Sequence, residues 1–295
     1  MISPRARCLV AGLLSLLLAS ACAGGPTTPI AKLTAAVGPS SATTAAGWIM
    51  TSTVLAELRA QDPSHTTTDR LDSPTTFVTI TRPGQVPAGW TVTQTQVFDS
   101  ATGLVAAVQG HTLIAGVRAV LLDIERWNLT PTDEQNDPAS AYATAYPVAH
   151  SHGLELVATP GLDLASVVAR SMHEPTWQAY LDNLRLPQKI APHADVFEVQ
   201  SQSTEAQPAT FATLLSQAEA QVRTANPSAV FFGGGATNPD GAAMTAARML
   251  AAVRATNGAV TRYWLNDAQQ GSGCPKCNGP YPAMAFAFLS GVEAM

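Results

Sequence analysis

Residues 119–125 read AVLLDIE, an apolar run of strand length that ends in two carboxylic acids. The same kind of run returns as LELVAT, VFEVQSQ, AVFFGGG and RYWLN, at residues 154–159, 196–202, 229–235 and 262–266. Segments with the apolar spacing of helices separate most of these runs. Strands that alternate with helices predict a parallel sheet with right-handed crossovers.

The separating segments carry helix signals of their own. Residues 138–152 are followed by Gly153, a typical helix stop, and Pro147 is expected to kink or divide this helix. Residues 208–225 place apolar side chains along one helical face, namely Phe211, Leu214, Leu215, Ala218 and Val222.

Further strand candidates precede these runs, at residues 77–81, at 93–98 and around Trp48. Seven or eight strands in about 250 residues predict a (β/α)8 TIM barrel over residues 47–295. The first strands are the part of this barrel in which an irregular arrangement is expected. A doubly wound open sheet is the alternative. The sequence has no Walker motif and no Gly-x-Gly-x-x-Gly after an early strand, which disfavours a nucleotide-binding sheet. The three glycines at 233–235 instead predict close backbone packing.

The N-terminal residues have the pattern of an export signal. Residues 1–21 combine a positively charged start, a short apolar run and small residues before Cys22. The sequence Ala-Ser-Ala-Cys resembles a lipobox, which would make Cys22 a lipidated first residue, whereas cleavage by an ordinary signal peptidase would release a secreted protein. Residues 22–46 are rich in Ala, Thr, Pro and Gly, and they predict a flexible tether. We expect an extracytoplasmic protein that contacts the cell membrane only through this anchor.

Composition narrows the range of partners. The net charge is −5 and there is no basic cluster, which argues against nucleic acid as a partner. Hydrophobic residues make up 46% of the chain and charged residues 13%, so a large core can form. A carbohydrate or another small polar molecule is the expected ligand, without a cofactor.

Two cysteines lie in the predicted domain, Cys274 and Cys277, within a loop rich in Gly, Ser and Pro. Cys-Pro-Lys-Cys could be half of a zinc site, a redox dithiol or a structural disulfide. No second cysteine pair or nearby histidine pair completes a zinc site, so no metal is expected. Outside the cytosol, a disulfide between the two cysteines is the favoured interpretation.

The acids on the strands suggest chemistry. Side chains alternate between the two faces of a strand, so Asp123 and Glu125 should point into the barrel, as should Glu198 and Gln200. Hydrolysis of a glycosidic bond commonly uses two carboxyl groups on either side of that bond. We predict Glu125 and Glu198 as the catalytic pair, and Asp123 as a support for Glu125.

Other residues near the strand ends could bind a sugar. Indole rings offer flat faces to sugar rings, and side-chain amides can bind hydroxyl groups. The predicted substrate-binding residues are Trp127, Gln200, Gln202, Asn238, Trp264 and Asn266. The structural alternative is that these polar groups only bind one another inside the barrel, with Arg126 or Arg262 neutralising a carboxylate.

Several of these stretches together resemble a group of uncharacterised exported actinobacterial proteins that look like glycoside-hydrolase-type TIM barrels. They are DIERWNLTPTDEQNDP at 123–138, VFEVQSQ, ATNPDG at 236–241, YWLND at 263–267 and GCPKCNGPYP at 273–282. The similarity covers about residues 93 to 290, and it implies the fold more than a substrate. The longer Asp-Gly-x-Asp-x-Asp-x-Glu run of chitinase-like enzymes is missing, so their substrate-assisted mechanism is not carried over.

The sequence therefore predicts a carbohydrate-active barrel of the cell envelope, a glycoside hydrolase with paired carboxylates. A lipoprotein that binds a glycan or small ligand without turnover is the alternative from another class. A degenerate barrel with a purely structural role is the third. A metal-dependent phosphodiesterase is disfavoured, because its early histidine signatures are absent.

Overall fold

The computed structural model describes residues 46–239, 244–269 and 276–295. The predicted signal segment, Cys22 and all but the last residue of the predicted tether lie outside the described residues, as does Cys274.

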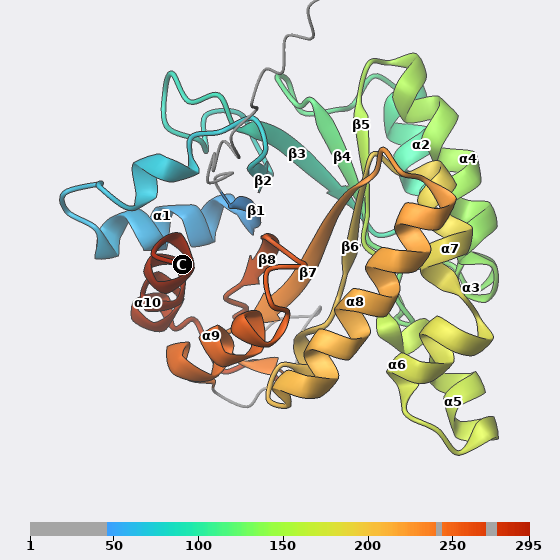
Figure 1. Cartoon of the computed structure of the whole chain (residues 1–295). Coiled ribbons are helices and arrows are strands. Elements are labelled where there is room, and N and C mark those ends of the chain that lie inside the picture. The colour runs from blue at the N-terminus through green and yellow to red at the C-terminus, as the bar shows by residue number, and fades with distance from the viewer. Residues whose placement is uncertain (1–45, 240–243, 270–275) are drawn as a thin grey trace, which may run out of the picture. The chain divides into compact units, whose positions relative to one another are not determined.

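Eight parallel strands close into a barrel in chain order, because each strand pairs with the next and β8 pairs with β1 (Figure 1). The strands are β1 (Gly47–Thr51), β2 (Phe77–Thr79), β3 (Thr93–Phe98), β4 (Ala119–Leu122), β5 (Glu155–Ala158), β6 (Val196–Val199), β7 (Val230–Ala236) and β8 (Arg262–Asn266). The predicted TIM barrel is confirmed, and the open sheet is ruled out because a closed barrel has no edge strand.

Helices cover the outside of the barrel (Figure 1). The helices are α1 (Ser52–Gln61), α2 (Ala101–Gln109), α3 (Thr132–Asn136), α4 (Pro138–Ser151), α5 (Ser166–Met172), α6 (Thr176–Gln178), α7 (Leu186–Ile190), α8 (Pro208–Ala225), α9 (Ala246–Ala255) and α10 (Pro282–Glu293). Residues 80–92, which join β2 to β3, contain no helix. The irregularity predicted for the first strands is located in this connection.

The alternation of side chains along the strands separates two apolar layers. The inner layer consists of Ile49, Phe77, Ala119, Leu121, Val157, Val196 and Phe232. The next residues along the same strands, such as Leu122 and Phe197, belong to the larger layer between the strands and the helices. Asp123 and Glu198 therefore follow the inward parity, as the sequence predicted.

The longest helix matches its prediction, and the helix with an internal proline departs from it. α8 has the predicted bounds and buries the predicted apolar face. Pro147 does not divide α4, which runs unbroken from Pro138 to Ser151. Pro147 is exposed, so the carbonyl that loses its helical partner lies on the solvent side of the helix. Gly153 follows α4 with a φ of +69°, the conformation that favours glycine after a helix.

The three glycines of β7 bring other groups very close to its backbone. A Cβ atom on Gly234 would lie 2.5 Å from Oε1 of Glu198 and 2.9 Å from Oε1 of Gln202. A Cβ on Gly235 would meet nothing nearer than Oε1 of Glu205, at 3.2 Å. Gly234 is thus the position at which the barrel wall makes room for two side chains of the β6 end.

We expect Gly234→Ala to destabilise the protein by about 1–3 kcal/mol, because the new methyl group overpacks the interior against the Glu198 carboxyl. Gly235→Ala is the matched control, since it adds the same methyl group one residue along the strand with more room. Chemical denaturation of both variants measures the difference. Equal stability of the two variants would contradict the tight contact at Gly234.

Candidate active site

A cavity of about 620 Å³ opens at the carboxyl ends of the barrel strands. Active sites of barrels of this type lie at this end, because the loops that follow the strands meet there. The cavity is lined by Thr51, Thr53, Val54, Asp123, Glu125, Trp127, Gln200, Gln202, Trp264, Asn266, Asp267, Ala268 and Gln269. Among the predicted catalytic and substrate-binding residues, Glu198 and Asn238 are the two that do not line it.

Asp123 lies on the cavity wall directly after β4, and it is 9% exposed. Its Oδ1 accepts hydrogen bonds from Nε2 of Gln200 at 2.7 Å and from Oγ1 of Thr159 at 3.2 Å. Burial raises the pKa of Asp123 well above its usual range, and the nearby Glu125 raises it further. Asp123 is thus a fixed acid that holds its proton more tightly than an exposed aspartate.

Glu125 is more exposed than Asp123 and has a pKa in the neutral range. Burial, followed by the charge of Asp163, raises the pKa of Glu125 to about 7, and the Gln200 side chain opposes this shift. Gly161 gives the side chain its room, since a Cβ there would lie 2.9 Å from Cγ of Glu125. A carboxyl group with a pKa near neutrality can donate or accept a proton at physiological pH.

Glu198 lies beneath the cavity. It has no exposed surface, and neither carboxyl oxygen has a hydrogen-bond partner. Burial raises the pKa of Glu198 well above its usual range, and Asp123 and Glu125 add to this shift. The structure therefore brings Glu198 into the same cluster of acids without exposing it to the cavity, and direct contact with a substrate in this conformation is excluded.

Trp127 is held by the loop that follows β4. Its Nε1 donates to Oγ1 of Thr130 at 2.8 Å, and the backbone N–H of Glu125 donates to the same oxygen at 3.4 Å. The Thr130 hydroxyl in turn donates to the carbonyl of Asp99 at 2.7 Å. One buried threonine thus ties the predicted sugar platform to the backbone of Glu125.

The opposite wall comes from β8 and the residues after it. Trp264 and Asn266 line the cavity, and Nε1 of Trp264 is buried without a partner. Asp267 also lines the cavity, but its carboxylate accepts from Oγ1 of Thr237 at 2.5 Å and from the N–H of Tyr281 at 2.7 Å. The hydrogen bonds of Asp267 are thus used to hold the loop in place.

Asn238 does not reach the cavity. It is 1% exposed, and its Nδ2 donates to the carbonyl of Ala268 at 2.9 Å. This contact joins the end of β7 to the loop after β8. The structure gives Asn238 a loop-bracing position in place of the predicted contact with substrate.

Three acids that belong to this region were not selected from the sequence. Asp99 and Asp163 both raise the pKa of Glu125, and Asp267 lies on the far wall. Asp99 and Asp267 directly follow β3 and β8, as Asp123 follows β4. The rule that an acid after a barrel strand faces the mouth would have found both.

The described residues offer no arrangement of three or more His, Cys, Asp or Glu side chains suited to a metal ion. None of the helices in the described ranges has the length and apolar character needed to span a bilayer. Cys277 is disulfide-bonded, and its predicted partner Cys274 lies outside the described residues.

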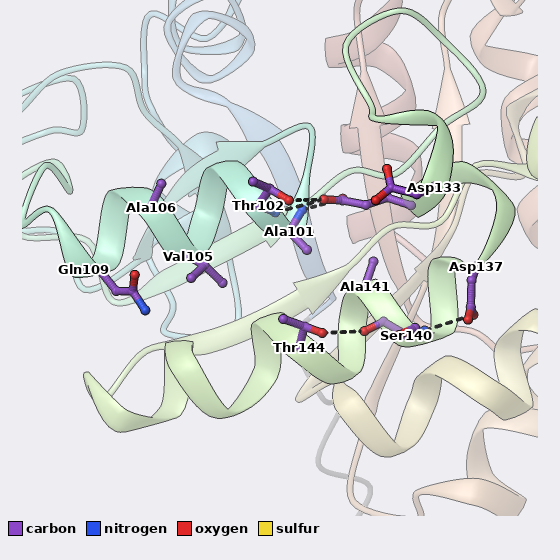
Figure 2. A pocket seen from close by; sticks show the side chains of 11 residues that line it. Ala101, Thr102, Val105, Ala106, Gln109, Asp133, Asp137, Ser140, Ala141 and Thr144 are labelled. Carbon is purple, nitrogen blue, oxygen red and sulfur yellow. Dashed lines mark hydrogen bonds between the residues drawn. The ribbon is translucent and has the colours of Figure 1, made fainter.

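A second cavity of similar volume, about 610 Å³, lies outside the barrel between α2 and α4 (Figure 2). Two of the three acids that line it bind the first N–H groups of helices. Glu134 accepts from the N–H groups of Ala101 and Thr102 at the start of α2, and Asp137 accepts from the N–H of Ser140 at the start of α4. These groups stabilise the helix ends, so the barrel mouth remains the candidate active site.

Glu205 is a buried acid outside the cavity. Its Oε2 accepts from the N–H of Ala236 at 2.9 Å, and burial raises its pKa to about 8 from an ordinary value of 4.5. Between these two values the folded protein holds a proton that the unfolded chain has released. Glu205 therefore lowers the free energy of unfolding as the pH rises through this range.

We expect Glu205→Gln to reduce the loss of stability between pH 5 and pH 8, because glutamine keeps the acceptor for Ala236 and does not titrate. Thermal unfolding at the two pH values measures the effect. Glu219→Gln, on the outer surface of α8, is the matched control. An unchanged pH slope in Glu205→Gln would contradict the buried neutral state.

We expect Asp163→Asn to lower the pKa of Glu125, because it removes a nearby negative charge while asparagine can still accept from the N–H of Arg126. Titration of the glutamate side-chain carbons by NMR measures this pKa. Asp182→Asn, at an exposed position, should leave it unchanged. The same pKa in both variants would show that Asp163 does not act on Glu125.

No protein-family model matches the chain, and no curated protein sequence matches it. Matching solved structures include the carboxyl transferase domain of pyruvate carboxylase from Rhizobium etli with 3-hydroxypyruvate, at 10% identity and a TM-score of 0.40. That match covers 69% of this chain and 35% of the other, so the chain spans about a third of that relative.

Two further matches cover more of their partners. Triosephosphate isomerase from Bartonella henselae has 10% identity and a TM-score of 0.45, over 84% of this chain and 99% of the other. A GH128 (subgroup III) curdlan-specific exo-β-1,3-glucanase from Blastomyces gilchristii, in complex with glucose, has 14% identity and a TM-score of 0.40, over 74% and 89%. Their names describe different reactions, so these likenesses do not select an activity, and the fold assignment rests on the strand order of the barrel itself.

Proposed function

We propose that this protein is a carbohydrate-active hydrolase that cleaves a glycosidic bond at the mouth of the barrel. The observation that carries the proposal is the cavity itself. Two acids of raised pKa, Asp123 and Glu125, line the same hollow as two indole rings, those of Trp127 and Trp264. Carboxyl groups supply the chemistry of glycoside hydrolysis, and indole faces suit the apolar faces of sugar rings.

Glu125 is the proposed proton donor. Its pKa of about 7 keeps a proton available near neutral pH, and its side chain reaches the cavity. In the proposed step, the Glu125 carboxyl gives its proton to the leaving glycosidic oxygen as the bond to the sugar carbon breaks, while the oxygen of a water molecule bonds to that carbon and the water gives a proton to the second carboxylate. The sequence predicted this residue as one of two catalytic carboxyl groups, without assigning which of them donates the proton.

Asp123 is the proposed second carboxyl group, in place of Glu198. It lines the cavity, whereas Glu198 has no exposed surface. Gln200 and Thr159 donate hydrogen bonds to Asp123, which fixes its orientation and favours its ionised form once a positive charge develops on the sugar. Glu198 is then a buried acid close to the pair, whose pKa Asp123 and Glu125 raise.

Amide groups around the cavity can orient a hydroxyl-rich substrate. Gln202, Asn266 and Gln269 line it, and a side-chain amide can both donate to and accept from a sugar hydroxyl. The volume of about 620 Å³ suits a few sugar units, which favours a glycan over a macromolecule that would need a wide groove. With the predicted export signal, a glycan of the cell envelope or its surroundings is the proposed substrate.

We expect Glu125→Gln to lower the turnover of an accepted glycan by at least about 100-fold with little change in binding, since it removes the proton donor and keeps the shape. Release of reducing ends from a panel of polysaccharides measures turnover. Glu219→Gln on α8 is the matched control and should keep full activity.

The rate should also fall as the pH rises through about 7, because Glu125 loses the proton that it donates. Full turnover by Glu125→Gln would remove this residue from the mechanism. Tight glycan binding without turnover by the wild-type protein would overturn the hydrolase and leave a binding protein.

A further inference from the structure

We propose that the ligand of this cavity carries a positive charge, and that its class is a glycan with free amino groups. The inference rests on the proposed function and names the substrate class of the same site. The starting observation is that acidic side chains and unpartnered acceptor atoms gather at the cavity, and that its described lining residues include no cationic side chain.

The charge of the lining is one-sided. Asp123, Glu125 and Asp267 line the cavity, and among the described residues of its lining there is no Lys, Arg or His. Asp99 and Asp163 act on Glu125 from close by. The ion pairs among the described residues all lie elsewhere, between Arg59 and Asp69, His150 and Asp195, and Arg223 and Glu219.

Arg126 is the cation nearest to this cluster along the chain, and it does not neutralise the cavity. Its backbone N–H and its charge act on Asp163, and its Nε is buried without a partner. When they are ionised, the acids of the mouth therefore repel one another, with no counter-charge among the described residues that line it. A bound cation would relieve this repulsion, whereas a neutral sugar would not.

Unpartnered acceptor atoms converge beneath the mouth. Both carboxyl oxygens of Glu198 and the Oε1 of Gln202 are buried without a donor. One oxygen of Glu198 and that of Gln202 lie 2.5 and 2.9 Å from the same point, the position of a Cβ on Gly234. Gln202 lines the cavity, whereas Glu198 has no exposed surface, so the pair lies behind the cavity wall and acts on a ligand through its electrostatic potential.

An ammonium group suits this potential. It carries a positive charge, three donors and no acceptor, so it can bind the carboxyl oxygens of Asp123 and Glu125 on the cavity wall. The indoles of Trp127 and Trp264 lie on the same lining and can add cation–π attraction. A metal ion fits less well, because the described residues hold no group of three metal-binding side chains in reach of one another.

Proton release distinguishes this mode of binding from ordinary sugar binding. Asp123 and Glu198 hold their protons to unusually high pH, and a cation placed beside them favours their ionised forms. Binding of an ammonium near neutral pH should therefore release protons to the buffer. Binding of a neutral sugar should leave the proton count nearly unchanged.

The test compares three β-1,4-linked tetrasaccharides, which are built from glucosamine, from N-acetylglucosamine and from glucose. They differ in one substituent of each sugar unit. Calorimetry on the full chain in two buffers of different ionisation enthalpy gives affinity and proton release. We expect the glucosamine tetramer to bind at least about tenfold more tightly than the other two. Its affinity should fall as the salt concentration rises, and its binding should release protons.

Two variants probe the acceptor pair. Glu198→Gln should reduce both the preference for glucosamine and the proton release, and Gln202→Met should reduce the preference by removing the acceptor on the wall. Gln202→Met keeps the test decisive if Glu198→Gln does not fold. Glu219→Gln should behave as wild type.

Equal affinity for the three tetramers would overturn the charge inference and leave the hydrolase proposal intact. Butylammonium and butanol serve as probes without a sugar. Binding of butylammonium alone, with no tetramer bound or cleaved, would overturn the hydrolase proposal and the assignment to an amino-bearing glycan.

Discussion

A closed barrel admits only every second residue of each strand to its interior, and the rest of this structure depends on that constraint. On β4 the rule sends Leu121 inward, Leu122 outward and Asp123 inward again, just where the apolar inner layer ends. On β6 it sends Glu198 inward as well. The same geometry that packs the core therefore delivers acids to a common space at the mouth, and it leaves them no route to solvent except the cavity.

Burial of the acids at this end of the barrel costs free energy, and the structure accommodates each acid differently. Gln200 and Thr159 donate to Asp123, while burial raises the pKa of Glu198, whose carboxyl group receives no hydrogen bond. A glycine on the adjoining strand leaves the space that this carboxyl occupies. Such an arrangement favours function over stability, since an apolar residue of similar size at position 198 would avoid the cost. The arrangement therefore favours a site that binds a ligand over a purely structural cluster of acids.

Much of the barrel could be predicted from the sequence because it depends on local patterns. The strand runs, the apolar face of 208–225 and the parity of Asp123 and Glu125 all follow from spacing along the chain. Depth could not be predicted in this way, since whether Glu198 reaches the cavity depends on the register of β6 against its neighbours. Asp99 and Asp267, by contrast, directly follow strands, and their place at the mouth could have been predicted from that position. Of the two effects predicted for Pro147, division of the helix does not occur, because the effect of a proline depends on whether its face of the helix meets water.

The hydroxyl of Thr130 has one hydrogen and two lone pairs, and the described contacts use all three. It therefore has no free donor or acceptor for a solvent molecule or an arriving ligand, and its hydrogen bonds stay within the protein. The indole of Trp127 and the chain at Glu125 are consequently immobilised when the protein folds, and their conformational entropy is lost at that stage. An incoming molecule meets a recognition surface and an acid that are already in register, and its binding free energy is not spent on ordering them.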